Sequence, residues 1–306
     1  MNLEYDVIII GAGPAGLTAG LYTSRAKLNT LIIEKELFGG ELMNRDLIEN
    51  FPGFPEGVIG PELGSKMLTQ AKQYGVTLAL DDVLKVIIND SKIIVQCMQK
   101  QYLGRSLIIC SGAHSKKLGI PGEDEYRDRG VFYCATCDGP KYENKSVTVV
   151  GGGDSGLTEA LQLIKIASKV TVIESQSRCT ATRMILEKAL AEPNFKLLNS
   201  TKINAILGDK EVESVNITDL QSGEESILET EGVLVRIGII PNTEYLKATI
   251  PLNENGQVIV NQRMETSIPG VFAAGDVRSE SACQISSASG DGATAAISLE
   301  KWLGIR

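Results

Sequence analysis

The sequence has one histidine, few aromatic residues and no long apolar run. His114 is the only histidine among 306 residues, so a His-rich metal centre and most Ser-His-Asp triads are excluded. Aromatic residues make up 5% of the chain, which leaves few platforms for the bases of single-stranded nucleic acid. The longest apolar run near the N-terminus, residues 7–10, is far shorter than the ~20 residues that span a bilayer. We therefore expect no metal site, no nucleic-acid partner and no membrane partner.

Basic charge and clustered cysteines are also scarce. Lys and Arg number 30 against 38 Asp and Glu, a net charge of −8, whereas binding to a phosphate backbone needs clustered cations. Of the six cysteines only Cys134 and Cys137 lie close together, and no signal-type segment precedes the first apolar run. A small secreted scaffold would hold far more cysteine, so we expect a cytoplasmic protein. Its length exceeds the roughly 50–200 residues of one domain and predicts two.

The chain contains an internal repeat with a spacing of 140 residues (151 − 11). In the first copy a β-rich run leads into the glycine loop 11–16, and a second β-rich run ends at Glu34. In the second copy the loop 151–156 and Glu174 stand at the same places, and each acid follows its first glycine by 23 positions. The runs between them predict parallel strands joined by a helix, as in doubly wound α/β domains. The predicted strands are residues 5–10, 30–33, 146–150 and 169–173.

Each loop has the G-x-G-x-x-G spacing of a dinucleotide site. The first glycine makes a tight turn, the second lets the backbone approach a pyrophosphate, and the third packs the helix against the strand. The N–H groups at the helix N-terminus then face the phosphates, and the acid accepts hydrogen bonds from a ribose diol. Two such sites in one chain predict electron transfer between a flavin and a nicotinamide. The candidate residues are Gly11, Gly13, Pro14, Ala15, Gly16 and Glu34 in one site, and Gly151, Gly153, Asp154, Ser155, Gly156 and Glu174 in the other.

Two later segments support a flavin and a divided first domain. Residues 270–276 form a short apolar run that ends in a Gly-Asp turn, where the carboxylate of Asp276 could bind polyol hydroxyls. The helical pattern over residues 286–303 would direct its N-terminal dipole at the same ligand. We expect one domain made of residues 1–115 and 245–306, with residues 116–244 inserted as a second domain.

The pair Cys134 and Cys137 carries the predicted chemistry. A zinc site needs four ligands, and no second pair with usable spacing exists in the sequence. A pair of structural thiols is the remaining alternative. A redox disulfide is favoured because C-x-x-C closes a tight ring, and a helix terminus or a nearby charge can lower the pKa of its thiols. Asp138 follows directly and could donate or accept the proton as the dithiol forms.

On these residues the chain resembles the low-molecular-weight thioredoxin reductases, and the C-terminal flavoprotein part of alkyl hydroperoxide reductase, over nearly its whole length. The matching segments are residues 11–16, 39–42, 49–53, 134–140, 151–156 and 275–277. The resemblance implies an α/β homodimer in which each chain has two Rossmann-like domains, the second inserted into the first. It also implies FAD in the divided domain, a pyridine nucleotide in the inserted one, and a swivel between them.

The resemblance further implies a thioredoxin-disulfide reductase, with the role of each site residue. Cys137 would face the flavin, Cys134 would attack the disulfide of the partner, and Asp138 would be the acid and base. The partner would be thioredoxin or a glutaredoxin-like protein. The flavin site would gain Gly40, Glu41, Leu42, Asn50, Gly112, Gly275, Gln284 and Ile285.

Two departures from the family pattern bear on the electron donor and the flavin. Reductases that use NADPH carry His-Arg-Arg-x-x-x-Arg where residues 174–180 read Glu-Ser-Gln-Ser-Arg-Cys-Thr. A carboxylate at Glu174 would repel a 2′-phosphate and accept a free 2′-OH, so NADH is predicted over NADPH, with Arg178 and Arg183 as solvated charges. Cys283 replaces the arginine of the family's Arg-Gln-Ala run, which leaves the flavin potential open. A ferredoxin-type donor, and a flavin-based sensor without turnover, are the alternatives.

Overall fold

The structure is a computed structural model that describes residues 4–45, 47–89, 92–133, 135–247 and 249–305, with residues 136, 137 and 239 described by their backbone alone. The chain divides into two compact units. Unit 1 comprises Met1–His114 and Ile240–Arg306, and unit 2 comprises Ser115–Ile239. The second boundary lies five residues earlier than the predicted one. Residues 240–244 pack with unit 1, where the Asn242 N–H donates to the carbonyl of Gly112 at 3.0 Å.

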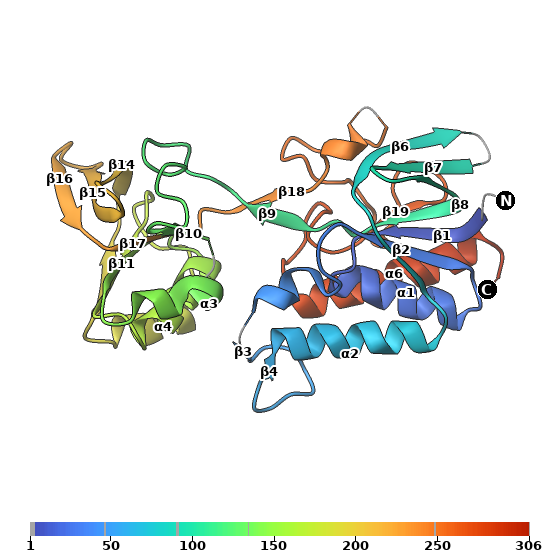
Figure 1. Ribbon diagram of the computed structural model, residues 1–306, viewed down its shortest axis with the longest axis horizontal. Helices are drawn as coiled ribbons and strands as arrows, with labels where there is room; N and C mark the ends of the chain where they lie inside the picture. The colour runs from blue at the N-terminus through green and yellow to red at the C-terminus, as the bar shows by residue number, and fades with distance from the viewer. Residues whose placement is uncertain (1–3, 46, 90–91, 134, 248, 306) are drawn as a thin grey trace. The chain divides into compact units, whose positions relative to one another are not determined.

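Unit 1 is built on a seven-stranded sheet (Figure 1). Six strands follow the order β5-β2-β1-β8-β7-β6, and the seventh, β19, pairs with β8. The strands β5, β2, β1, β8 and β19 are parallel, and β6 and β7 are antiparallel. The strands are β1 (Glu4–Ile10), β2 (Thr30–Glu34), β5 (Thr77–Leu80), β6 (Val83–Asn89), β7 (Lys92–Cys97), β8 (Gln101–Ile109) and β19 (Val271–Ala273). A small hairpin pairs β3 (Leu47–Ile48) with β4 (Val58–Ile59).

Both faces of the unit 1 sheet are covered, which explains the unbroken apolar runs in its strands. Val7 and Ile9 face the helices α1 (Pro14–Arg25), α2 (Gly60–Gln73) and α6 (Ile285–Trp302), of which α1 and α6 lie side by side (Figure 1). Ile8 and Ile10 face the opposite layer, to which the short helix η3 (Glu244–Leu246) contributes. Helix α1 begins at Pro14, directly after Gly13, because proline in the first turn has a backbone φ suited to a helix and lacks an N–H that would need a partner.

Unit 2 repeats the parallel architecture on a smaller sheet with the order β10-β17-β11-β12-β13. Its strands are β10 (Val131–Phe132), β11 (Ser146–Val150), β12 (Lys169–Ile173), β13 (Phe195–Leu198) and β17 (Gly232–Val235). Its helices are α3 (Ala135–Asp138), η2 (Gly139–Tyr142), α4 (Asp154–Ile164) and α5 (Arg183–Leu190). An antiparallel sheet of β14 (Thr201–Gly208), β15 (Val212–Asp219) and β16 (Glu225–Glu229) packs beside it.

The two predicted βαβ units are present as β1-α1-β2 and β11-α4-β12, and in each the two strands pair in parallel. The α/β prediction is therefore confirmed. The connecting strands β9 (Ala113–Ser115) and β18 (Ile239–Pro241) form a two-stranded sheet of their own. In the part of the chain that the structure describes, no helix combines the length and the apolar character that a membrane span requires.

Candidate flavin, nucleotide and disulfide sites

The first glycine loop has the geometry of a phosphate cradle. Gly11 has φ +98°, and a Cβ there would lie 2.2 Å from the carbonyl oxygen of Cys110. A Cβ on Gly16 would lie 1.9 Å from the carbonyl oxygen of Gly11, so the helix can approach the loop only without a side chain. Gly13 faces open space, and α1 begins after it with no side-chain cap. The free N–H groups of the first turn are thus available to an anion.

Glu34 is held against this loop by backbone donors. Its Oε2 accepts the N–H of Ala12 at 2.7 Å, and its Oε1 accepts the N–H groups of Lys35 at 2.9 Å and Glu36 at 3.0 Å. A carboxylate offers about four acceptor sites, so capacity remains for ribose hydroxyls beside the three backbone bonds. The carboxylate predicted to bind the ribose is therefore fixed in position beside the glycine loop.

The structure brings several of the other predicted flavin residues to the same edge of unit 1. Gly40 opens η1 (Gly40–Asn44), and a Cβ there would lie 3.0 Å from the Cα of Gly13. Asn50 donates through Nδ2 to Oε1 of Gln284 at 3.0 Å, which joins two segments 234 residues apart. Gln284 also caps α6 in a capping box with Ser287. The remaining predicted residues lie nearby in the fold: Glu41 and Leu42 in η1, Ile285 at the start of α6, and Gly112 after β8.

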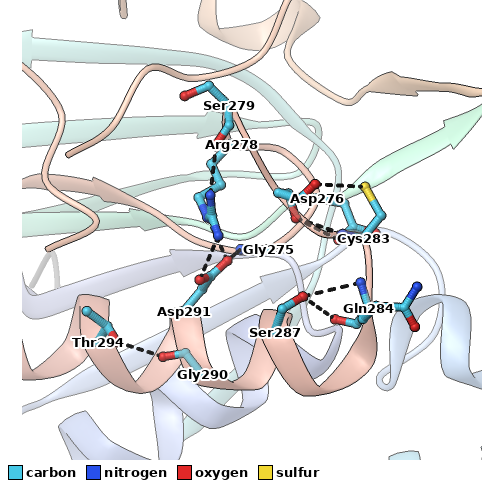
Figure 2. A network of polar contacts seen from close by, with 11 residues as sticks. Gly275, Asp276, Arg278, Ser279, Cys283, Gln284, Ser287, Gly290, Asp291 and Thr294 are labelled. Atoms are coloured by element: carbon cyan, nitrogen blue, oxygen red, sulfur yellow. Dashed lines mark hydrogen bonds and ion pairs between the residues drawn. The ribbon is translucent and has the colours of Figure 1, made fainter. Parts of the chain in front are cut away.

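Beside the predicted Gly275-Asp276 turn lies a buried ion pair that the sequence analysis missed. Arg278 donates through Nε and Nη2 to the two carboxylate oxygens of Asp291, at 2.7 and 3.0 Å, and the Gly275 N–H donates to the same carboxylate at 3.1 Å (Figure 2). The side chains of Arg278 and Asp291 are 14% and 10% exposed. Asp291, an acidic residue within the apolar pattern of α6, was the sequence signal that could have indicated this pair. The pair fixes the turn from which Asp276 projects.

Burial raises the pKa of Asp276, an effect that the hydrogen bond from the Ser281 hydroxyl opposes. Hydroxyl donors from a polyol would compensate this half-buried carboxylate, as predicted for a ligand there. Cys283 is exposed and has φ +51°, in the left-handed region that non-glycine residues rarely adopt. Partial desolvation of its thiol group and the charge of Asp276 raise the pKa of Cys283, so the thiol form is favoured.

The second glycine loop reproduces the geometry of the first. Gly151 has φ +120°, and a Cβ there would lie 2.1 Å from the carbonyl oxygen of Arg236. A Cβ on Gly156 would lie 2.0 Å from the carbonyl oxygen of Gly151. Glu174, 7% exposed, accepts the N–H groups of Gly152 and Gln176, each at 2.8 Å, as Glu34 does in the first loop. Asp154 and Ser155 begin α4, at the place that Pro14 and Ala15 have in α1.

The segment after Glu174 folds back onto this loop, as the segment after Glu34 does onto the first, where the Gly39 N–H donates to the carbonyl of Ala12 at 2.9 Å. The carbonyl oxygen of Gly152 accepts the N–H of Thr180 at 3.1 Å and the thiol of Cys179 at 2.8 Å. The Thr182 N–H donates to Oδ1 of Asp154 at 2.5 Å. Arg178 is exposed. Arg183, whose side chain is 90% exposed, pairs with Glu187 along α5 at 2.7 Å.

The predicted redox pair is only partly covered by the structure. Cys134 lies outside the described residues, and Cys137 is described by its backbone in α3. Asp138 ends α3 and forms an ion pair with Lys141, with Nζ and Oδ1 2.7 Å apart. Tyr142 is buried nearby, and burial together with the charge of Asp138 raises its pKa to about 12. A carboxylate thus stands next to Cys137 in the chain, with an exposed ammonium group as its partner.

The chain is similar to known proteins over nearly its whole length. The sequence profile of the pyridine nucleotide-disulphide oxidoreductase family matches residues 5–292. A thioredoxin reductase of Bacillus subtilis is 42% identical over 300 residues, which cover 98% of this chain and 95% of the relative. The crystal structure of Lactococcus lactis thioredoxin reductase matches with a TM-score of 0.95 at 37% identity and covers 98% of this chain and 99% of that one. A ferredoxin-flavin thioredoxin reductase from Clostridium acetobutylicum is 27% identical, with a TM-score of 0.54, and the match covers 99% of both chains.

Proposed function

Because this chain belongs to the low-molecular-weight thioredoxin reductases of the pyridine nucleotide-disulphide oxidoreductase family, we propose that it transfers electrons from NADH, through FAD and the Cys134–Cys137 disulfide, to a thioredoxin-like protein. The observation that carries the proposal is the presence of two dinucleotide cradles and a C-x-x-C-D sequence in one chain. The overall reaction consumes NADH, one proton and a protein disulfide, and yields NAD⁺ and a protein dithiol.

The residues of unit 1 fit a bound FAD. The pyrophosphate would lie at Gly13 and the N-terminus of α1, where a Cβ would meet no atom and the N–H groups lack a cap. Glu34 would hold ribose hydroxyls, and Asp276 would accept hydrogen bonds from a hydroxyl of the ligand. The segment joined by Asn50 and Gln284 would hold the ring system. Bound FAD supplies a two-electron carrier between a hydride donor and a disulfide.

Residues of unit 2 favour NADH as the donor. Glu174 is buried and fixed by two backbone N–H groups, so its charge stays where a 2′-phosphate would have to lie. Ser175 and Gln176 are neutral at positions where NADPH-dependent relatives carry arginine. Repulsion without a compensating cation disfavours NADPH, whereas the same carboxylate can accept hydrogen bonds from a free ribose diol.

The dithiol then reduces the acceptor by thiol–disulfide exchange. The Cys134 thiolate attacks a sulfur of the acceptor disulfide, and the other acceptor sulfur leaves as a thiolate that takes up a proton. Cys137 next attacks Cys134 in the mixed disulfide, which releases the second acceptor thiol and restores the Cys134–Cys137 disulfide. Asp138, which follows Cys137 in the chain and pairs with Lys141, would hold and move the protons. By resemblance, the protein works as a homodimer.

Replacement of Cys137 tests this proposal. C137S should retain flavin but lose the reduction of thioredoxin by NADH, because the mixed disulfide cannot be resolved. The matched control is C97S, which changes a buried cysteine at the end of β7, outside the proposed sites, and should retain turnover. Thioredoxin reduction by C137S at the wild-type rate would overturn the proposal. Wild-type protein that is reduced once but never turns over thioredoxin would indicate a flavin-based sensor.

A ferredoxin-type donor is the second candidate. It is favoured by Thr180, whose hydroxyl lies 3.7 Å from a Cβ position on Gly153, whereas no atom lies within 4 Å of the same position on Gly13 in the first loop. Anaerobic mixing with NADH, and separately with NADPH, distinguishes the donors through the loss of flavin absorbance. Bleaching by NADH alone supports the proposed donor. Bleaching by neither, with dithionite still effective, favours an iron–sulfur protein.

A further inference from the structure

A buried ion pair in unit 2 contacts the peptide groups on both sides of Cys134. Glu159, on α4, accepts the N–H of Ala135 through Oε2 at 2.8 Å. Arg236, directly after β17, donates through Nη1 to the carbonyl oxygen of Tyr133 at 3.2 Å. The guanidinium also donates to Oε1 of Glu159. One charge thus holds the residue before the cysteine, and the opposite charge holds the residue after it.

The pair is too deeply buried to be an ordinary surface contact. The side chain of Arg236 is 9% exposed and that of Glu159 is 3% exposed, and Nη1 of Arg236 also donates to the hydroxyl of Ser115 at 3.1 Å. Desolvation of two ions offsets much of their attraction, so a buried pair is often no more stabilising than apolar side chains of the same volume. Stability alone therefore does not account for it. The second glycine loop does not account for it either, because the atoms of Arg236 nearest to Gly151 and Gly156 are its carbonyl group and its Cβ, and not the guanidinium.

We propose that Glu159 and Arg236 are positioning residues for the Cys134–Cys137 couple, which fix the backbone around Cys134 and balance the charge beside it. The inference rests on the proposed disulfide chemistry. Reduction adds two electrons from NADH and two protons, breaks the S–S bond and leaves two thiols. The sulfur atoms, about 2.05 Å apart in the disulfide, must then separate and later meet again. A fixed backbone keeps Cys134 where the bond can re-form.

Helix α3 gives Glu159 a second physical role. Ala135 is the first residue of α3, so its N–H is one of the donors that a helix start leaves without an intrahelical partner. Glu159 satisfies this donor from a different helix, as a capping side chain would. Its negative charge opposes a thiolate at this helix start, and Arg236 compensates that charge. Other charged groups near this segment are Asp138 with Lys141, Glu123, which accepts the hydroxyl of Tyr133 at 2.8 Å, and Arg127, whose guanidinium lies 5.7 Å from the centre of the Tyr133 ring. The test leaves all of them unchanged.

The test is the alkylation of Cys134 by iodoacetamide in the reduced holoprotein, followed by peptide mass spectrometry between about pH 5 and pH 9. E159Q keeps an oxygen acceptor for the Ala135 N–H but leaves the positive charge of Arg236 unbalanced. Alkylation near pH 7 should then rise about tenfold, because a nearby cation favours the thiolate. R236M leaves the carboxylate unbalanced, and alkylation should fall about tenfold. Y126F removes a buried 2.6 Å hydrogen bond to the Gly208 carbonyl in the same unit and should match the wild type.

If the alkylation rate of Cys134 shifts in opposite directions in E159Q and R236M, the two residues act on the thiol through their charges. A purely structural role would lower the melting temperature of both variants without opposite shifts in the alkylation rate. Shifts of the same sign, or none beyond those of Y126F, would overturn the proposal. If R236M does not fold, the double variant E159M/R236M replaces both ions with side chains of similar volume and should fold.

The double variant has its own readout. Its charges cancel, so its alkylation should follow the wild-type pH dependence. The loss of both backbone contacts should nevertheless lower the equilibrium constant for disulfide formation against dithiothreitol about tenfold, because pre-organisation is lost. An unchanged constant would refute backbone positioning. These readouts need no turnover of thioredoxin, so failure of the proposed function shows itself separately, in the coupled assay of the wild-type protein.

Discussion

Two arginines placed beside Glu174 should convert the donor preference of this protein. The variant S175R/Q176R restores cations at two exposed positions where NADPH-dependent relatives carry them, and leaves Glu174 in place. A charged hydrogen bond contributes roughly 1.5–3 kcal/mol, but solvent screening at exposed positions reduces this to about 1 kcal/mol each. Two such bonds give about 2 kcal/mol, which corresponds to about a thirtyfold gain in kcat/KM for NADPH.

The assay is anaerobic stopped-flow reduction of the flavin by NADH and by NADPH over a range of concentrations. The second-order rate constant for flavin reduction by NADPH should rise about thirtyfold, while the constant for NADH changes little. S168R/S226R is the matched control, because it adds two arginines at exposed serines of the same unit; Ser168 directly precedes β12, at the end opposite Glu174, and Ser226 lies in β16. The reasoning is refuted if NADPH gains nothing, or if the control gains as much as the variant.

Three further predictions concern the acidic residues. D276N should lose flavin on gel filtration more readily than the wild type. Without flavin, D276N should be more stable than the wild type at neutral pH and equally stable near pH 3. Burial raises the pKa of Asp276 in the folded protein, so this residue destabilises the fold only at a pH at which its carboxyl group ionises. Equal stability of the two flavin-free proteins at both pH values would contradict this. R278M leaves the buried carboxylate of Asp291 unpaired and should cost roughly 3 kcal/mol in the free energy of unfolding, measured by urea titration. K141M breaks a pair whose lysine is 65% exposed, so its cost should stay below about 1 kcal/mol, and a loss as large as that of R278M would show that the Asp138 pair is not a surface contact.

Much of the fold could be predicted because its signals are local. A β-branched run followed by a glycine loop and a helix specifies a βαβ unit within about 30 residues, and the repeat with its two acids made the pattern unambiguous. Both predicted units are present. The domain boundary was predicted less well, because residues 240–244 have no local pattern that distinguishes one unit from the other. Their place is decided by hydrogen bonds to residues 111 and 112, about 130 positions earlier.

The sequence by itself determined the α/β class, the two dinucleotide loops, the C-x-x-C-D segment and the family. These depend on residue types at short, regular spacings, which constrain the backbone wherever they occur. Only the tertiary structure decided which buried charges support those elements. Arg236 and Glu159 are 77 positions apart, and Arg278 and Asp291 are 13 apart. No spacing rule links such residues, because each pair forms only when separate strands and helices have packed and excluded water from both charges.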